Sequence, residues 1–366
     1  MDPDPRRQVV NAEFATPTAL RIGHLQSVRN RVLPRRYDLD ALATARTIFV
    51  ATEDGSGDRL AVTIHRRRSV DRAHDPHLAA ERLQSSRCRG LVLLVHGLGG
   101  SAESVYIRAT AVGLLDAGFN VARVDLRCAG LSRATTANTY HAGKSEDLRA
   151  VLHALARRPE AGTGGDGAPR LAVVGFSLGG AMTLKLLGEP LDGLPVVAGV
   201  TVSAPLDLVV GAEHISGALF GAYERAIVRT LRADAMTPAP DGSPRLTPAE
   251  REGVLAARTL PEFDDALTAP RHGWRDAYEY YEVNSAGPYL SRISVPTLVI
   301  HALDDPMIPA CPYLAIDWDG LERTGPVRRA ITAHGGHVGF HQRRNPMPWY
   351  VGRAVDFLVE SGPRSP

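Results

Sequence analysis

The chain has 366 residues, 44% of them hydrophobic, so it is long enough for one large domain with an insertion or for two domains. The formal net charge is only +2, and the arginine clusters are short and lack interleaved aromatics, which argues against a nucleic-acid partner. The three cysteines lie far apart, which excludes a disulfide framework and a paired-cysteine metal site. The sequence shows neither a signal-peptide pattern nor a run of about 20 uncharged apolar residues. We therefore expect a cytoplasmic protein without a stable membrane anchor.

Short apolar segments alternate with helical patterns along most of the chain. The expected strands are 47–53, 60–65, 90–95, 120–125, 171–174, 196–203, 297–301 and 327–332. The helical patterns are 104–117, 145–158, 181–187 and 349–358, with a loop or short helix at 66–89 and a glycine-rich loop at 161–168. This alternation predicts an α/β fold with a mostly parallel, doubly wound sheet, whose functional site lies at the carboxyl ends of the strands.

The alternation stops between residues 207 and 292. This stretch contains helical patterns at 218–232 and 247–258, a proline-rich loop at 237–248 and an aromatic segment at 274–281. An insertion of this length between core strands predicts a helical cap over the site, with mere extra packing as the alternative. We expect Trp274, Tyr278 or Tyr281 to help line an acyl pocket. The chain then divides into an arm (1–45), the first part of the core (46–206), the cap (207–292) and the second part of the core (293–366).

A G-x-S-x-G pattern, Gly175–Gly179, joins the apolar segment 171–174 to a buried helical pattern. A sharp turn between a strand and a helix holds its central residue in a strained backbone conformation and leaves room only for glycine at its flanks. The hydroxyl of Ser177 would then project at the end of the sheet, above the amino terminus of a helix. The pattern therefore predicts that Ser177 is a nucleophile, with an ordinary glycine-rich turn as the alternative.

A serine nucleophile needs a base, and the base needs a group that orients it. The strand 297–301 runs into Asp304 and Asp305, and the last strand runs into a glycine-rich loop that contains His337. Serine, aspartate and histidine at three strand ends, in this chain order, is the arrangement of α/β-hydrolase folds. We therefore expect Ser177, one of the two aspartates and His337 to act together.

The oxyanion formed in such a reaction needs hydrogen-bond donors. In this fold the donors are the backbone N–H groups of the residue after the nucleophile and of the loop after an early strand, here Leu178 and Leu98. His96 precedes the glycines of that loop and is expected to stabilise it rather than to serve as a second base. No carboxylate or cysteine stands at metal-ligand spacing from the late histidines, so we expect neither a metal nor a cofactor.

A set of spaced segments carries a family resemblance over about residues 21–340. The segments are 23–26, 96–101, 140–143, 146–147, 175–180, 203–205, 262–265, 268–270, 277–278, 301–305 and 334–340. In these the chain resembles the YheT-type branch of the α/β-hydrolase superfamily, which includes bacterial esterases, yeast medium-chain alcohol acyltransferases and mammalian membrane-anchored lipases. The resemblance implies a charge relay of Ser177, Asp305 and His337 and action on carboxylic esters. The family's Arg-Gly pair is Arg127-Cys128 here, which leaves the role of that loop open.

Two adjacent aspartates compete for the position beside His337. Neighbouring side chains after an extended strand point in roughly opposite directions, so only one of them faces the histidine loop. Related hydrolases place the acid three residues after a small residue and four before a proline, and Ala302 and Pro309 bracket Asp305 in this way. We therefore expect Asp305 to be the relay acid and Asp304 to be a turn or helix-capping residue.

Together these patterns predict a serine hydrolase that cleaves short- to medium-chain carboxylic esters through an acyl-enzyme on Ser177. One alternative is an alcohol O-acyltransferase that uses the same three residues. Another is a ligand-binding protein on the same fold that does not turn over. The expected partner is a small-molecule ester, and the sequence leaves the oligomeric state open.

Overall fold

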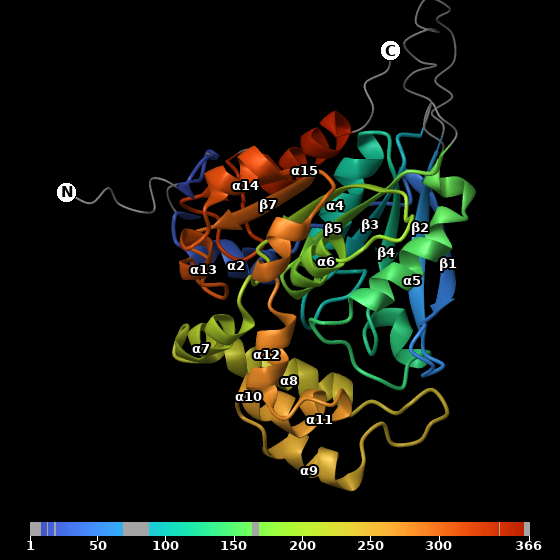
Figure 1. The fold of residues 1–366 in the computed structure, drawn as a ribbon, viewed down its shortest axis with the longest axis vertical. Coiled ribbons are helices and arrows are strands. Elements are labelled where there is room, and N and C mark those ends of the chain that lie inside the picture. The colour runs from blue at the N-terminus through green and yellow to red at the C-terminus, as the bar shows by residue number, and fades with distance from the viewer. Residues whose placement is uncertain are drawn as a thin grey trace, which may run out of the picture.

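The computed structural model describes residues 9–12, 14–17, 20–68, 88–162, 168–343 and 345–361. Its centre is an eight-stranded sheet in the order β1-β2-β4-β3-β5-β6-β7-β8 (Figure 1). The strands are β1 (Ala43–Ala51), β2 (Arg59–Arg67), β3 (Leu91–Val95), β4 (Asn120–Val124), β5 (Leu171–Phe176), β6 (Val196–Val202), β7 (Thr297–Ala302) and β8 (Val327–Thr332). β2 runs antiparallel to both of its neighbours, and all other neighbouring strands are parallel. The predicted mostly parallel sheet is confirmed.

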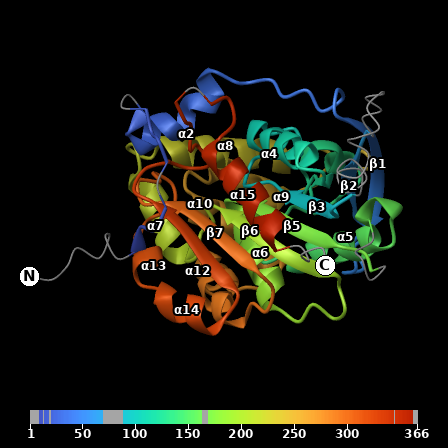
Figure 2. The same ribbon diagram turned by 90° about the horizontal axis from the view of Figure 1, so that it is seen from above.

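Helices cover both faces of this sheet (Figure 2). The helices α4 (Val105–Asp116) and α15 (Trp349–Glu360) pack on one face, and α5 (Ser145–Ala156) and α6 (Leu178–Gly188) pack on the other. Successive side chains of β3 alternate between the two hydrophobic clusters, because Val92 and Leu94 lie with α4 while Leu93 and Val95 lie with α5 and α6. A strand that is apolar on both faces is stable only inside such a layered sheet, which explains the continuous apolar run of β3.

The remaining core elements are short. They are α2 (Gly23–Val32), η3 (Gly130–Ala134), η4 (Pro159–Ala161), α13 (Cys311–Leu314) and α14 (Trp318–Thr324). No helix within the described ranges is long and apolar enough to cross a bilayer. The expected loops at 66–89 and 161–168 fall largely on residues 69–87 and 163–167, which lie outside the described residues.

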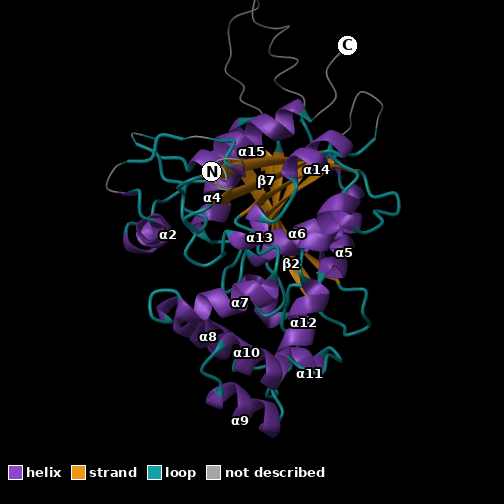
Figure 3. Ribbon diagram, turned by 60° about the vertical axis from the view of Figure 1, so that its left-hand side comes forward, coloured by secondary structure: helices purple, strands orange, loops and turns teal. Residues whose placement is uncertain are grey.

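The segment between β6 and β7 forms a separate group of helices below the sheet (Figures 1 and 3). Its elements are α7 (Leu208–Gly217), α8 (Ala222–Ala235), α9 (Pro248–Ala256), α10 (Leu260–Phe263), the π-helix η5 (Asp264–Thr268), α11 (Ala269–Arg271), α12 (Ala277–Asn284) and η6 (Gly287–Arg292). Part of it has a small hydrophobic cluster of its own, which includes Val254, Phe263 and Leu267.

One helix boundary in this segment was predicted wrongly. The helix expected at 218–232 begins only at Ala222, and a further helix, α7, precedes it. Leu219, Phe220 and Gly221 all have positive φ angles, of 49°, 53° and 73°, and so cannot continue a right-handed helix. Helical periodicity does not reveal this break because the first two residues are ordinary apolar side chains.

Arg127 ties three separate segments together behind the carboxyl end of β4. It is completely buried, and its guanidinium donates to both carboxylate oxygens of Asp147 at the start of α5, at 2.7 and 2.6 Å. It also donates to Asp58 at 2.8 Å and to Asp54 at 2.7 Å, in the turn between β1 and β2. Burial alone would lower the pKa of Arg127, but these carboxylates raise it above its ordinary value, so the side chain is charged. The sequence left the role of the Arg127-Cys128 loop open, and these contacts show that Arg127 links separate segments of the fold.

Cys128, next in the chain, occupies a position that suits glycine. Its φ angle is 57°, in the left-handed region, and its thiol donates to the carbonyl oxygen of Asp234 at 3.1 Å. A Cβ atom in this region clashes with the neighbouring carbonyl group. The family's glycine at this place is thus explained, and the cysteine adopts the same backbone at a steric cost.

We expect Cys128→Gly to be more stable than Cys128→Ala by about 1 kcal/mol, because both variants lose the thiol but only glycine adopts this backbone without strain. Urea unfolding of the two variants side by side measures the difference in the free energy of unfolding. Equal stabilities, or a more stable alanine variant, would contradict the strain assigned to this position.

Candidate active site

Ser177 lies at the sharp turn between β5 and α6. Its backbone has φ 51° and ψ −124°, and its N–H donates to the carbonyl oxygen of Val202 at 2.9 Å. A methyl group added at Gly179 would collide with the carbonyl oxygens of His96 and Val95, so the elbow touches the end of β3 directly. The strained turn predicted from the G-x-S-x-G pattern is therefore present, and it aims the serine hydroxyl at the end of the sheet.

His337 stands between Ser177 and Asp305. Its Nε2 atom lies 3.0 Å from the Ser177 hydroxyl, and its Nδ1 atom lies 2.9 Å from Oδ2 of Asp305. Since an ionised carboxylate only accepts, Nδ1 carries the proton and Nε2 is free to accept the serine proton. The three residues thus form one continuous hydrogen-bonded chain, contributed by the ends of β5, β7 and β8.

Asp305 is held so that its charge is stable in a buried position. Its side chain is fully buried, and its other oxygen, Oδ1, accepts from the backbone N–H groups of Met307 at 2.8 Å and Ile308 at 3.0 Å. Burial alone would raise the pKa of Asp305, but its electrostatic interaction and hydrogen bond with His337, together with the hydrogen bond from Met307, lower it below its ordinary value. The carboxylate is therefore ionised and can stabilise a proton on the imidazole.

Asp304 lies in the turn that follows β7, as expected, and it also contacts the histidine loop. Its Oδ1 atom accepts from the N–H of Gly336 at 2.8 Å, and its Oδ2 atom lies 3.2 Å from Nδ1 of His334. It therefore caps no helix but fastens the histidine loop to the end of β7. The expected turn position is therefore present and the helix-capping alternative is not; the contact with the histidine loop was not predicted, because only the tertiary fold brings that loop to Asp304.

Helix α2 also fastens this loop. The Ser27 hydroxyl accepts from the backbone N–H of His337 at 2.7 Å and donates to the carbonyl oxygen of Gly23 at 2.7 Å. Gln26, which is completely buried, accepts from the N–H of His341 at 2.7 Å and donates to its carbonyl oxygen at 3.3 Å. The predicted arm thus positions the site. Gln26 lies in the segment 23–26 of the family resemblance, the only signal that could have marked it.

The loop after β3 carries Leu98, one of the two expected oxyanion donors. Tyr106 accepts from the N–H of Gly97 at 3.0 Å, and Tyr140 accepts from the N–H of Gly99 at 2.6 Å, so the loop is fixed on both sides of Leu98. Within the described ranges, no acceptor is recorded for the N–H groups of Leu98 and Leu178. Both leucines line the same pocket as Ser177, which leaves these donors available to a ligand.

His96 stabilises this loop from within, as the sequence analysis expected. It is completely buried, its Nε2 atom accepts from the N–H of Leu126 at 3.1 Å, and its Nδ1 atom therefore donates to the carbonyl oxygen of Gly97 at 2.8 Å. Burial lowers the pKa of His96, so the ring is neutral. Both ring nitrogens are occupied in the fold, and neither is free to take a proton from Ser177.

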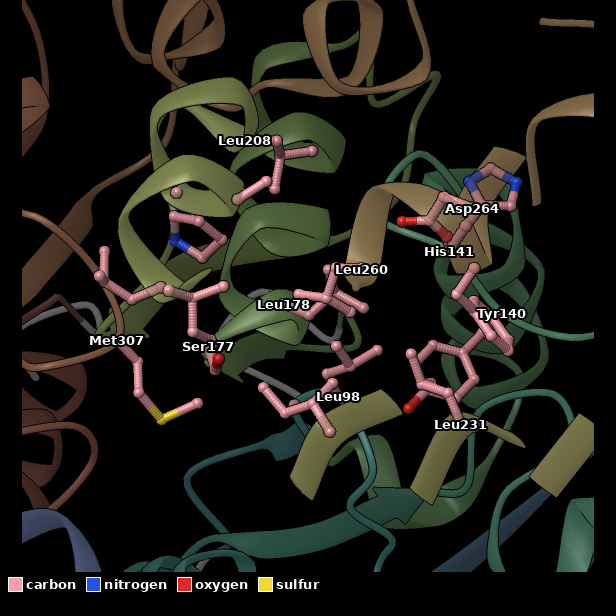
Figure 4. Close-up of a pocket in the computed structure, with 18 of the residues that line it drawn as sticks. Leu98, Tyr140, His141, Ser177, Leu178, Leu208, Leu231, Leu260, Asp264 and Met307 are labelled. Carbon is pink, nitrogen blue, oxygen red and sulfur yellow. The ribbon is translucent and has the colours of Figure 1, made fainter. Parts of the chain in front are cut away.

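A pocket of about 310 Å³ opens beside Ser177 and extends between the sheet and the inserted helices (Figure 4). Its wall is mostly apolar and includes Leu208 from α7, Leu231 from α8 and Leu260 from α10. Of the three aromatic residues expected here, Tyr281 lines the pocket, whereas Tyr278 is 44% exposed and outside the lining.

Trp274 is likewise not among the lining residues. It packs against Tyr280, with ring centroids 4.9 Å apart, and Tyr280 itself is in the pocket wall. Tyr280 was not among the residues predicted to line the pocket, because helical spacing alone does not show which side of a short aromatic helix faces it.

The contact between α2 and the histidine loop generates a stability prediction. Ser27→Ala leaves the partly buried N–H of His337 without its acceptor, and we expect a loss of about 1–3 kcal/mol in the free energy of unfolding. The control is Ser243→Ala, an exposed serine that bonds only within its own turn, for which we expect a change below about 0.5 kcal/mol. Urea unfolding compares them, and equal effects would show that the bond to His337 contributes nothing.

Curated relatives share sequence with most of this chain. "Putative esterase YheT" of Escherichia coli is 34% identical over 276 residues, which are 73% of this chain and 76% of the relative. "Medium-chain fatty acid ethyl ester synthase/esterase 2" of Saccharomyces cerevisiae is 30% identical over 293 residues, and "Monoacylglycerol lipase" of the same yeast is 28% identical over 286 residues. These matches cover 74% and 76% of this chain but only 62% and 60% of the two yeast proteins.

Solved structures show the same fold at low sequence identity. The Pyrococcus furiosus esterase Pf2001 superposes with a TM-score of 0.54 at 16% identity, covering 96% of this chain and 97% of that protein. An acylaminoacyl peptidase of Pyrococcus horikoshii also reaches a TM-score of 0.54, at 14% identity, covering 93% of this chain and 44% of its own. A family profile described as "Alpha/beta hydrolase family" matches residues 92–347. The chain therefore belongs to the α/β-hydrolase family.

Proposed function

We propose that the protein is a carboxylic ester hydrolase that works through an acyl-enzyme on Ser177. The observation that carries this proposal is the hydrogen-bonded chain from the Ser177 hydroxyl through His337 to Asp305, at 3.0 and 2.9 Å. Relatives that are named as an esterase, a lipase and an ester synthase/esterase support the substrate class. Their names describe those proteins, and the site gives the reason to extend the chemistry to this one.

In the first step His337 takes the proton of Ser177 at Nε2 while the serine oxygen attacks the ester carbonyl carbon. The carbonyl oxygen becomes an oxyanion, and the N–H groups of Leu98 and Leu178 donate to it. The imidazolium then gives its proton to the departing alkoxide, and the alcohol leaves an acyl-enzyme behind. Asp305 stabilises the imidazolium throughout, since its carboxylate remains ionised.

In the second step water replaces the alcohol. His337 takes a proton from the water, the resulting hydroxide attacks the acyl carbon, and the collapse of the second oxyanion returns the proton to Ser177. The chain supplies the nucleophile of the first step, and it supplies the base and the oxyanion donors for both steps; water is the nucleophile of the second. The inserted helices act as a cap whose leucines line an apolar acyl pocket, which favours short- to medium-chain acyl groups.

An acyltransferase would use the same acyl-enzyme and pass the acyl group to an alcohol. The relative named "ester synthase/esterase" is the specific observation that keeps this second function open. The ratio of free acid to new ester formed with added alcohol separates the two. If the protein is an ester hydrolase, we expect mostly free acid as the product when the added alcohol is dilute.

Ser177→Ala should abolish labelling by a fluorophosphonate and lower kcat for a p-nitrophenyl ester by a factor of about 10⁴ or more, because the attacking oxygen is absent. The variant should keep its fold, since among the described residues the Ser177 hydroxyl bonds only to His337. Circular dichroism serves as the control. A wild-type protein that does not label and does not turn over would instead support the ligand-binding alternative, and a labelled variant would remove Ser177 from its role.

Asp304→Asn and Asp305→Asn form a matched pair of neighbouring substitutions. We expect Asp305→Asn to lower kcat by about 10⁴, because an amide beside Nδ1 favours the wrong imidazole tautomer. Asp304→Asn keeps an oxygen that can accept from Gly336 and should lower kcat far less. Steady-state kinetics and thermal unfolding of both variants test this. The reverse order, with Asp304→Asn folded but inactive, would exchange the two assignments.

A further inference from the structure

The pocket beside Ser177 is not apolar throughout. Figure 4 shows Ser177 and Met307 on one side of it, His141 and Asp264 on the other, and Leu178 and Leu260 between them. The end away from the serine therefore carries an imidazole and a carboxyl group. A pocket that served only unsubstituted hydrocarbon chains has no use for such groups, which are costly to bury.

Asp264 is buried in the π-helix η5 without a cation to balance it. Its Oδ1 atom accepts from the Thr268 hydroxyl and its Oδ2 atom from the Tyr281 hydroxyl, both at 2.6 Å. No arginine, lysine or histidine forms an ion pair with it in the described part of the chain. Each carboxylate oxygen has a second lone pair, so Asp264 can still accept a hydrogen bond from a ligand in the pocket.

His141 offers the complementary donor. It is only 6% exposed, and its Nδ1 atom accepts from the backbone N–H of Gly143 at 3.0 Å, which places the ring proton on Nε2. Burial lowers the pKa of His141 well below its ordinary value, so the ring is neutral. Within the described residues no acceptor is recorded for this Nε2–H, although the residue lines the pocket.

Aromatic contacts join these two groups into one wall. The Tyr280 ring lies 5.8 Å from His141 and 5.1 Å from Tyr281, measured between centroids, and Tyr281 in turn donates to Asp264. Tyr280 accepts from the N–H of Ala142 at 3.0 Å, so its own hydroxyl proton is a further donor in the pocket wall. The acceptor Asp264 and the donors His141 and Tyr280 thus lie in one wall of the pocket, at the end of its apolar part.

We propose that this wall recognises a hydroxyl group carried by the substrate near the far end of its acyl chain. A hydroxyl donates one hydrogen bond and accepts others, so it can satisfy Asp264 and His141 together. A methyl group satisfies neither of them, and a carboxylate would meet the negative charge of Asp264. The substrate class is therefore an ester of a hydroxylated, otherwise aliphatic carboxylic acid.

The acyl chain, rather than the alcohol, occupies this end of the pocket. The alcohol leaves first, while the acyl group is still bonded to Ser177. His141 and Asp264 are both at least nine-tenths buried, so we place beside them the acyl group, which stays bonded to Ser177 after the alcohol has left. This inference rests on the proposed ester hydrolysis at Ser177 and adds the identity of the acyl group.

The test uses p-nitrophenyl esters of straight-chain acids of increasing length, each made with a terminal methyl and with a terminal hydroxyl. We expect kcat/KM for the hydroxyl form to exceed that of the methyl form by about tenfold or more at one matched length. A methyl preference at every length would overturn the proposal. Two other readouts report on the proposed function itself: hydrolysis of the p-nitrophenyl esters whose acyl chain ends in a methyl group, and fluorophosphonate labelling. If both are absent, the proposed ester hydrolysis has failed, rather than the inference about the hydroxyl group.

Variants then test which residues recognise the hydroxyl group. Asp264→Asn and His141→Phe should each reduce the hydroxyl-to-methyl ratio about tenfold or more, and two variants guard against a failure of one to fold. The matched control is Asp265→Asn, which changes an exposed neighbouring carboxylate outside the pocket lining and should leave the ratio unchanged. An equal fall in Asp265→Asn would overturn the assignment to Asp264.

A second pair of substrates tests which side of the ester reaches the wall. Hexanoate esters of a simple alcohol and of the corresponding terminal diol place the hydroxyl on the alcohol side. We expect their kcat/KM values to agree within about twofold. A hydroxyl preference on this side, and none on the acyl side, would overturn the placement of the acyl chain.

Discussion

The backbone of Ser177 is the constraint on which the rest of the site depends. Its left-handed conformation lifts the hydroxyl out of the sheet, and that turn exists only because α6 approaches the end of β3 so closely that Gly179 touches the carbonyl oxygen of His96. The same approach sets the loop after β3, with Leu98, beside the N–H of Leu178. The proposed nucleophile and the proposed oxyanion donors thus lie beside one close packing contact between backbone atoms.

The imidazole of His337 needs equal precision, but it lies on a loop. The fold supplies that precision by giving the backbone of the loop hydrogen-bond partners on two elements, Asp304 at the end of β7 and Ser27 and Gln26 on α2. An N-terminal helix, remote in sequence, therefore determines how the base is held. Such fixed surroundings keep the hydrogen bonds to Ser177 and Asp305 at a geometry suited to proton transfer.

The inserted helices give the pocket two kinds of surface. Leucines of α7, α8 and α10 provide the apolar passage, while the π-helix η5 turns the carboxyl group of Asp264 toward its far end. A π-helix is a costly irregularity that persists mostly at functional sites. Here it coincides with the buried carboxyl group, whose pKa burial raises to about 6. In the proposed reaction the insertion therefore contributes selectivity, and the strand ends of the sheet contribute the groups that react.

The sequence alone determined the alternation of strands and helices, the elbow at Ser177 and the order of serine, aspartate and histidine, because each is a local pattern or follows from chain order. It favoured Asp305 over Asp304 by register, and the structure places Asp305 beside His337. Only the tertiary structure decided that Asp304 and Gln26 hold the histidine loop and that Tyr280 rather than Tyr278 faces the pocket. These contacts join residues distant in the chain, or depend on which face of a helix is covered, and local patterns carry neither kind of information.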